Sequence, residues 1–172
     1  PETLDPALNS AIDGANTLIT VFEPLLLIDE NNEVVPGQAD LPEVSEDGLT
    51  WTFTMKDGLK WSDGSDLTAK DFEYSFKRLA CPDTAAPYGE TVVGMIDGYQ
   101  GAIGNPDEDG NTTTDPDWDA LNVHASEDGK TLTIHGTPGN GLGQYLNGST
   151  IEVFGNAQEA VGDTMNDGDI II

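Results

Sequence analysis

The carboxylates are the residues of this chain that could most directly do chemistry, and one acidic run has the spacing of a calcium ligand set. Asn105, Asp107 and Asp109 alternate with other residues and precede Gly110, which is the order of the first half of an EF-hand loop. The twelfth position of such a loop should hold a bidentate Glu, but here it is Pro116. We therefore expect an acidic surface loop and no metal site, and a calcium-dependent surface domain is the alternative.

Covalent and acid–base catalysis find little support in the sequence. Cys81 is the only cysteine, and a catalytic thiol would need His124 or His135 beside it. Acidic residues are so numerous that any two could be nominated as an acid–base pair, so their abundance is not evidence. The chain also lacks a Ser-His-Asp signature, a phosphate-binding glycine loop and metal-spaced Cys or His sets. We expect no catalytic residue and no cofactor, and hence no enzyme.

The net charge limits the classes of partner. The 172 residues include 32 Asp and Glu against 6 Lys and Arg, a formal net charge of −26. Repulsion between like charges argues against nucleic acid or an anionic membrane surface as partner. Five of the six cations lie between Ser45 and Leu79, where we interpret them as charge balance in an acidic lobe. No apolar run is long enough to span a membrane, and a signal peptide, if one exists, precedes Pro1.

The elements that must position any site are clearest between Ser45 and Leu79. In the run Thr50 to Met55, threonine alternates with a large apolar residue, which predicts a strand with one buried face. Thr68 and Asp71 have the spacing of a capping box and predict the start of a helix. Its apolar stripe consists of Phe72, Phe76 and Leu79. We assign the two tryptophans of this stretch, Trp51 and Trp61, to the core.

The rest of the first 135 residues contains weaker signals. A helix is expected from Asp13 to about Glu23, ended by Pro24. Two extended pieces should flank a turn at residues 29–32, and two short strands should lie at residues 122–125 and 130–135. A weak amphipathic segment at residues 91–100 is interrupted by Gly94 and Gly98.

The last part of the chain contains an internal repeat. Leu142 to Val153 can be laid on Val161 to Ile172 at an offset of 19, which aligns Ile151 with Ile170. Recurrent glycines and one short β-rich run per copy are typical of a stacked β-solenoid. We therefore divide the chain into a lobe at residues 1–135 and a β-helix-like repeat segment at residues 136–172.

Several runs in the first part resemble a known family in their order and spacing. They are TLDPAL, VFEPLL, VVPG, SEDGLTWTF, LKWSDG, LTAKDFEYSFKRL and TAAPYG. Residues 1–134 resemble the N-terminal part of lobe I of the solute-binding proteins of family 5, the oligopeptide- and dipeptide-binding proteins of ABC importers. The resemblance implies an α/β fold of the type II periplasmic-binding-protein-like class, here a partial first lobe with a mixed sheet and few helices. It also implies an extracytoplasmic location, either periplasmic or as a cell-surface lipoprotein.

The same resemblance implies a function and a site. It implies capture of a short peptide for uptake, without catalysis, and delivery to the membrane permease of the transporter. The segment after TLDP, which here is Ser10, Ala11 and Ile12, would form part of the cleft wall and pair its backbone with the peptide. The tyrosine of the family's S/A-P-Y run corresponds to Tyr88, which would lie beside the ligand.

The tail resembles a different family. LGQYLNG, VFGNAQEAVGDTMNDG and the closing III are similar to the GXGXG β-helix module of glutamate synthase large subunits. In those enzymes the module is structural, so no catalytic residue is implied. A structural module of a glutamate synthase-like enzyme is thus the alternative function, and a fusion or a fragment would explain the two likenesses.

Overall fold

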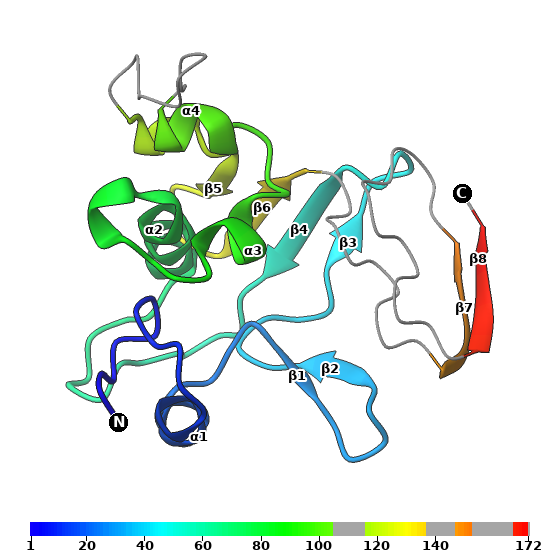
Figure 1. The fold of residues 1–172 in the computed structure, drawn as a ribbon, viewed down its shortest axis with the longest axis horizontal. Helices are drawn as coiled ribbons and strands as arrows, with labels where there is room; N and C mark the ends of the chain where they lie inside the picture. Colours follow the sequence, from blue (N-terminus) through cyan, green and yellow to red (C-terminus); the bar gives the residue numbers. More distant parts are fainter. Residues whose placement is uncertain (105–115, 137–146, 153–166, 172) are drawn as a thin grey trace.

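The lobe is built on a four-stranded sheet. The computed structural model describes residues 1–104, 116–136, 147–152 and 167–171, the last two ranges by their backbone only. The strands are β3 (Glu43–Val44), β4 (Thr50–Thr54), β6 (Thr131–His135) and β5 (Val123–Ala125), in that spatial order (Figure 1). Each of its pairings is antiparallel, which differs from the expected mixed sheet. Tight turns join β3 to β4 and β5 to β6, and such turns produce antiparallel neighbours.

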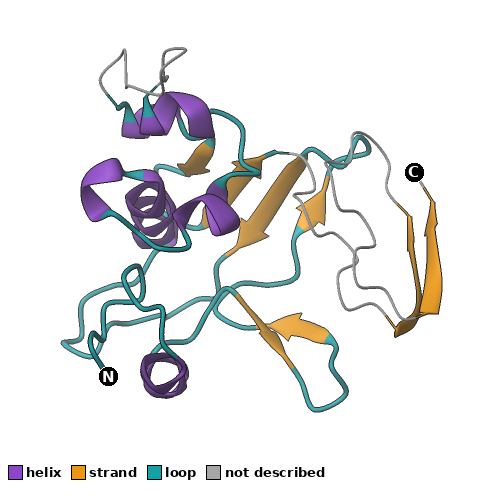
Figure 2. Ribbon diagram, in the orientation of Figure 1, coloured by secondary structure: helices purple, strands orange, loops and turns teal. Residues whose placement is uncertain are grey.

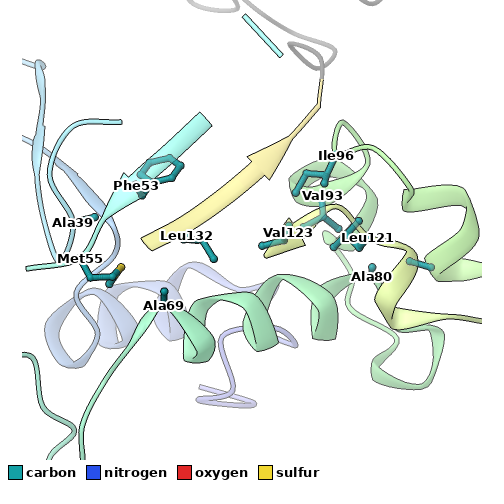
Figure 3. Close-up of a cluster of buried hydrophobic side chains, with 11 residues drawn as sticks. Ala39, Phe53, Met55, Ala69, Ala80, Val93, Ile96, Leu121, Val123 and Leu132 are labelled. Atoms are coloured by element: carbon teal, nitrogen blue, oxygen red, sulfur yellow. The ribbon is translucent and has the colours of Figure 1, made fainter. Parts of the chain in front are cut away.

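One long helix packs on this sheet. Helix α2 (Ala69–Ala80) begins with the predicted capping box, in which the backbone N–H of Thr68 donates to the Asp71 carboxylate at 2.8 Å. Its apolar side chains Phe72, Phe76 and Leu79 pack against the core, as predicted. Figure 3 shows Leu132 of β6 and Val123 of β5 pointing toward this helix. The strand pattern and the helical stripe therefore meet in a single core.

The apolar face of the sheet extends further than the helices that cover it. Phe53 lies opposite Leu132 and is buried, whereas Trp51, opposite Ile134, is 39% exposed. Trp61 is 40% exposed in a turn before α2, where its indole N–H donates to Asp71. The assignment of both tryptophans to the core is therefore wrong. Alternation identifies the face on which a side chain lies, but not how far the opposing helices reach along it.

The N-terminal part forms a helix and a hairpin beside the sheet. Helix α1 (Ile12–Val21) confirms the expected helix, and strands β1 (Leu26–Ile28) and β2 (Val34–Pro36) form a separate antiparallel pair (Figure 2). The apolar side chains of these elements are largely exposed, and Gly14 is the one residue of α1 that is buried. The exposed large apolar side chains of this N-terminal part are those of Leu4, Leu8, Ile12, Ile19, Val21, Phe22, Leu27, Ile28 and Val34.

Short helices fill the connection from α2 to β5. The segment predicted at residues 91–100 forms α3 (Gly89–Val93) and α4 (Tyr99–Ile103), with 3₁₀ turns at η1 (Pro82–Thr84) and η2 (Trp118–Ala120). Gly98 separates α3 from α4 with φ of +82°, and a Cβ there would lie 1.7 Å from the carbonyl oxygen of Ala120. Only glycine therefore fits the point where the helical segment breaks and packs on η2.

The tail contains two parallel strands at the predicted spacing. Strands β7 (Asn147–Glu152) and β8 (Asp167–Ile171) pair in parallel, and Ile151 lies opposite Ile170, which confirms the offset of 19. A register irregularity between Asn147 and Ser149 places Asn147 opposite Asp167, one residue beyond the predicted partner. The remaining repeat positions lie outside the described residues. Gly136, which the sequence placed in the tail, bridges to Ile96 and donates its N–H to Leu49 in the lobe.

Candidate functional site

The four residues expected to contact a ligand lie on two separate elements. Ser10, Ala11 and Ile12 lead into α1, and Tyr88 precedes α3. Figure 1 shows α1 and α3 apart, on different sides of the chain segments that run between them. The described part of the chain thus does not gather the predicted contacts into one pocket.

The segment Ser10 to Ile12 is only partly extended. Ala11 has an extended backbone, but its carbonyl oxygen accepts hydrogen bonds from the N–H of Ala15 and from the side chain of Asn9. Ile12 is already the first residue of α1 and is largely exposed. Pairing with a peptide backbone, as in strand addition, needs free N–H and C=O groups on an extended chain. Ala11 retains the extended conformation but not a free carbonyl, and Ile12 is helical.

Tyr88 stands at the beginning of an exposed apolar stripe. It is the N-cap residue of α3 and is 54% exposed, and its carbonyl accepts the N–H of Val92 at 3.0 Å. Residues four apart on a helix share a face, so Tyr88 and Val92 lie one above the other. Met95 follows just beyond the helix and is also exposed. An exposed tyrosine, valine and methionine therefore lie at the beginning of α3, on it and just beyond it.

An apolar pocket adjoins this stripe. Its volume is about 270 Å³, and it lies where the apolar face of the sheet extends beyond the helices. Phe53 and Ile96 are its buried lining residues, while Trp51, Val92 and Met95 are lining residues that remain exposed. The other lining residues are Phe76, Ile134 and Gly136. Each side chain of this lining is apolar. The pocket therefore suits an apolar group, and it has no charged side chain that could bind a charged group.

An ion pair fixes the segment that precedes Ser10. The guanidinium of Arg78 donates to both carboxylate oxygens of Asp5, at 2.8 and 2.5 Å. This bidentate bond holds the pKa of Asp5 below its ordinary value, with a smaller contribution from the N–H of Ala7. Asp5 belongs to the TLDP run and Arg78 to the last turn of α2, so the pair joins the two.

A second charged cluster lies between α2 and β5. Lys77 is only 8% exposed and donates to Glu73 at 2.7 Å and to Asp119 at 2.9 Å. The other oxygen of Glu73 accepts the backbone N–H of Ala125 at 2.9 Å. Burial alone would raise the pKa of Glu73, but the bonds from Lys77 and Ala125 outweigh it, and the pKa is lowered. These contacts serve the packing of α2, and they agree with the interpretation of the cations as charge balance.

The described residues add little to a catalytic or metal-binding interpretation. Cys81 is buried at the C-cap of α2, and His135 is engaged by the Thr50 hydroxyl at 3.1 Å. Within residues 1–104 and 116–136, no group of three or more His, Cys, Asp or Glu could hold a metal ion. The residues of the EF-hand-like run from Asn105 to Gly110 lie outside the described part. No described helix is long and apolar enough to cross a membrane.

Local sequence patterns do not reveal the pocket. Val92 and Met95 were seen only as parts of a weak amphipathic segment, because Gly94 interrupts their pattern. The spacing of four between Tyr88 and Val92 was an available signal. The contribution of Trp51 could not be found locally, since it depends on where α3 ends against the sheet.

Comparison with known proteins identifies related sequences. The family described as bacterial extracellular solute-binding proteins, family 5 Middle, matches residues 33–138. The periplasmic murein peptide-binding protein MppA of Escherichia coli is 41% identical over 88 residues, which are 51% of this chain and 16% of that protein. The match to the family ends before β7 and β8, and the alternative assignment to a glutamate synthase-like enzyme has no support.

Solved structures agree with this result. The structure of the Escherichia coli murein tripeptide-binding protein MppA superposes with a TM-score of 0.67 at 34% identity, and covers 80% of this chain and 25% of that one. Haemophilus influenzae OppA in complex with the peptide RPPGFSPFR superposes with a TM-score of 0.66 at 29% identity, over 80% of this chain and 25% of that one. The chain thus spans about a quarter of these structures, and its fold is that of part of a type II periplasmic-binding-protein-like protein.

Proposed function

Because the chain belongs to the bacterial extracellular solute-binding proteins of family 5, we propose that it is part of a peptide-capturing subunit of an ABC importer. The observation that carries the proposal is the family match over residues 33–138, supported by the superposition on MppA and on peptide-bound OppA. The subunit binds a short peptide without altering it and delivers it to a membrane permease. This role requires an extracytoplasmic location, at the periplasmic side of a membrane or as a cell-surface lipoprotein.

In this proposal, Tyr88 is the principal ligand contact within the chain. Its ring is exposed at the start of α3, and a tyrosine offers a large apolar surface with a polar tip. Ser10, Ala11 and Ile12 form a second contact through their backbone, which the extended conformation of Ala11 supports and the helical position of Ile12 does not. Since the chain spans about a quarter of the solved relatives, we expect weak binding, because enclosure of the peptide is incomplete.

The experiment is a titration of the ¹⁵N-labelled 172-residue chain with the peptide RPPGFSPFR, followed by two-dimensional NMR, which detects millimolar dissociation constants. We expect the amide signals around Tyr88 to shift. Replacing Tyr88 with Ala should raise the dissociation constant about tenfold, as is typical when a contact tyrosine is truncated.

The matched control is Tyr74→Ala, since Tyr74 is similarly exposed at 57% but lies on α2. This variant should bind like the unchanged chain. No shift of any amide at millimolar peptide would overturn the proposed function, and equal losses for both tyrosine variants would remove Tyr88 from the site.

A further inference from the structure

The apolar pocket and the Tyr88 stripe form one continuous surface. Val92 belongs to both, because it follows Tyr88 by one helical turn and lines the pocket. A ligand that contacts the ring of Tyr88 therefore lies within one helical turn, about 5 Å, of a pocket-lining side chain. Trp51 and Met95, which are also exposed, bring the sheet and the segment after α3 to the same opening.

The size and chemistry of the pocket restrict what can fill it. Pockets for drug-sized ligands usually measure about 300 to 1,000 Å³. The volume here, about 270 Å³, is smaller and suits a single large side chain. The lining combines three aromatic side chains, a thioether and aliphatic groups, which come from Trp51, Phe53, Phe76, Met95, Val92, Ile96 and Ile134. Phenylalanine fits such a lining, because aromatic rings pack favourably on other rings and on methionine sulfur.

The charge around the pocket indicates the kind of peptide that would bring this side chain. Glu90 is exposed on α3, and Asp47 is exposed in the turn whose Gly48 carbonyl accepts the indole N–H of Trp51. The whole chain carries a formal net charge of −26. A field of this sign attracts cationic ligands and raises their rate of association.

From these observations we infer that the pocket between β4, β6 and α3 is a subsite for an apolar, preferably aromatic, side chain of a cationic peptide. The inference rests on the proposed function, since it assumes that a peptide lies along Tyr88. It adds a specificity determinant: Val92, Met95 and Trp51 select the side chain that enters the pocket.

The test compares two peptides that differ only in apolar side chains. RPPGFSPFR and a version with both phenylalanines replaced by alanine are each titrated into the ¹⁵N-labelled chain. The phenylalanine peptide should bind about tenfold more tightly, because it alone buries a ring in the pocket. With this peptide, and not with its alanine version, the amides of Val92, Met95 and Ile134 should shift.

A charge placed at the opening provides the complementary test. In the Val92→Asp variant the advantage of the phenylalanine peptide should disappear, because the pocket would then open beside a carboxylate. Val34→Asp is the matched control, since Val34 is 56% exposed on β2, compared with 44% for Val92. The Val34→Asp control should keep the full difference in affinity between the two peptides.

The outcomes separate the two proposals. Binding of both peptides with equal affinity would overturn the subsite and leave peptide capture intact. Absence of binding by either peptide would overturn both. If Val92→Asp does not fold, the comparison of the two peptides on the unchanged chain still tests the subsite. Equal affinities, or amide signals of the pocket residues that do not shift, refute the inference.

Discussion

The contact between Lys77 and Glu73 allows a quantitative prediction about stability. The two charges lie 2.7 Å apart, and at an effective dielectric constant of about 20 they attract each other by about 6 kcal/mol. Removing each ion from water costs several kcal/mol, so the net contribution of the pair is small. Removing Lys77 alone, however, leaves the half-buried Glu73 with only the N–H of Ala125 as partner. We expect Lys77→Met to destabilise the fold by about 3 kcal/mol.

The double variant should recover much of this loss. In Lys77→Met with Glu73→Gln no uncompensated charge remains, and the glutamine oxygen can still accept the N–H of Ala125. We expect this variant to lie within about 1.5 kcal/mol of the unchanged chain. Asp119→Asn is the matched control, because Asp119 contacts the same ammonium group but is almost fully exposed. This substitution should change the free energy of unfolding little.

Urea unfolding followed by circular dichroism at 222 nm measures these differences. For a domain of this size, 3 kcal/mol corresponds to a fall in Tm of about 6 to 12 °C. A double variant as unstable as the sum of the two single variants would refute the reasoning, since it would mean that the two side chains contribute independently.

The pH dependence of the same cluster follows from the lowered pKa of Glu73. A carboxylate whose pKa is lower in the folded state contributes stability that is present above its unfolded value and is lost as pH falls through the folded value. The stability difference between the unchanged chain and Glu73→Gln should therefore shrink below about pH 4.5, the ordinary glutamate value. A difference that grows on acidification would contradict the assigned direction of the pKa shift.

Two further predictions concern the lobe as a whole. Phe72→Asp should unfold it, because it places a charge against the core at a cost of about 3 kcal/mol or more, whereas Tyr74→Asp on the exposed side of α2 should remain folded by circular dichroism. A folded Phe72 variant would show that α2 does not organise the lobe. Tm should rise as sodium chloride is increased from 0.1 to about 1 M. The Debye length then falls from about 10 to 3 Å, and the salt screens the repulsion within a chain whose formal net charge is −26. A falling Tm would mean that the ion pairs outweigh this repulsion.

Local signals in the sequence predicted the local structure well. The alternation at Thr50 to Thr54 and the capping box at Thr68 depend on neighbours within a few residues, and both are confirmed. The parallel pairing of Ile151 with Ile170 was also accessible, because a repeat converts a distant contact into a fixed offset. Such features follow from the chain without knowledge of its tertiary packing.

Long-range features could not be predicted in this way. The bond between Arg78 and Asp5 joins residues far apart in sequence, and nothing near either residue indicates its partner. Burial of Lys77 depends on Asp119 and β5 closing over α2, which a helical stripe does not reveal. The exposure of Trp51 was missed for the same reason. The roles of Ser10, Ala11, Ile12 and Tyr88 stay predictions, because they depend on a ligand.

The order of strands in the sheet has a consequence for synthesis of the protein. β4 lies between β3 and β6, yet roughly 75 residues separate the end of β4 from the beginning of β6. At about 5 to 20 residues per second, a ribosome needs several seconds to supply the partner. During this time Thr50 to Thr54 has one unpaired edge and exposes Phe53, a state open to strand exchange with neighbouring nascent chains. The negative charge of the chain opposes such exchange, because nascent chains of the same sequence repel each other.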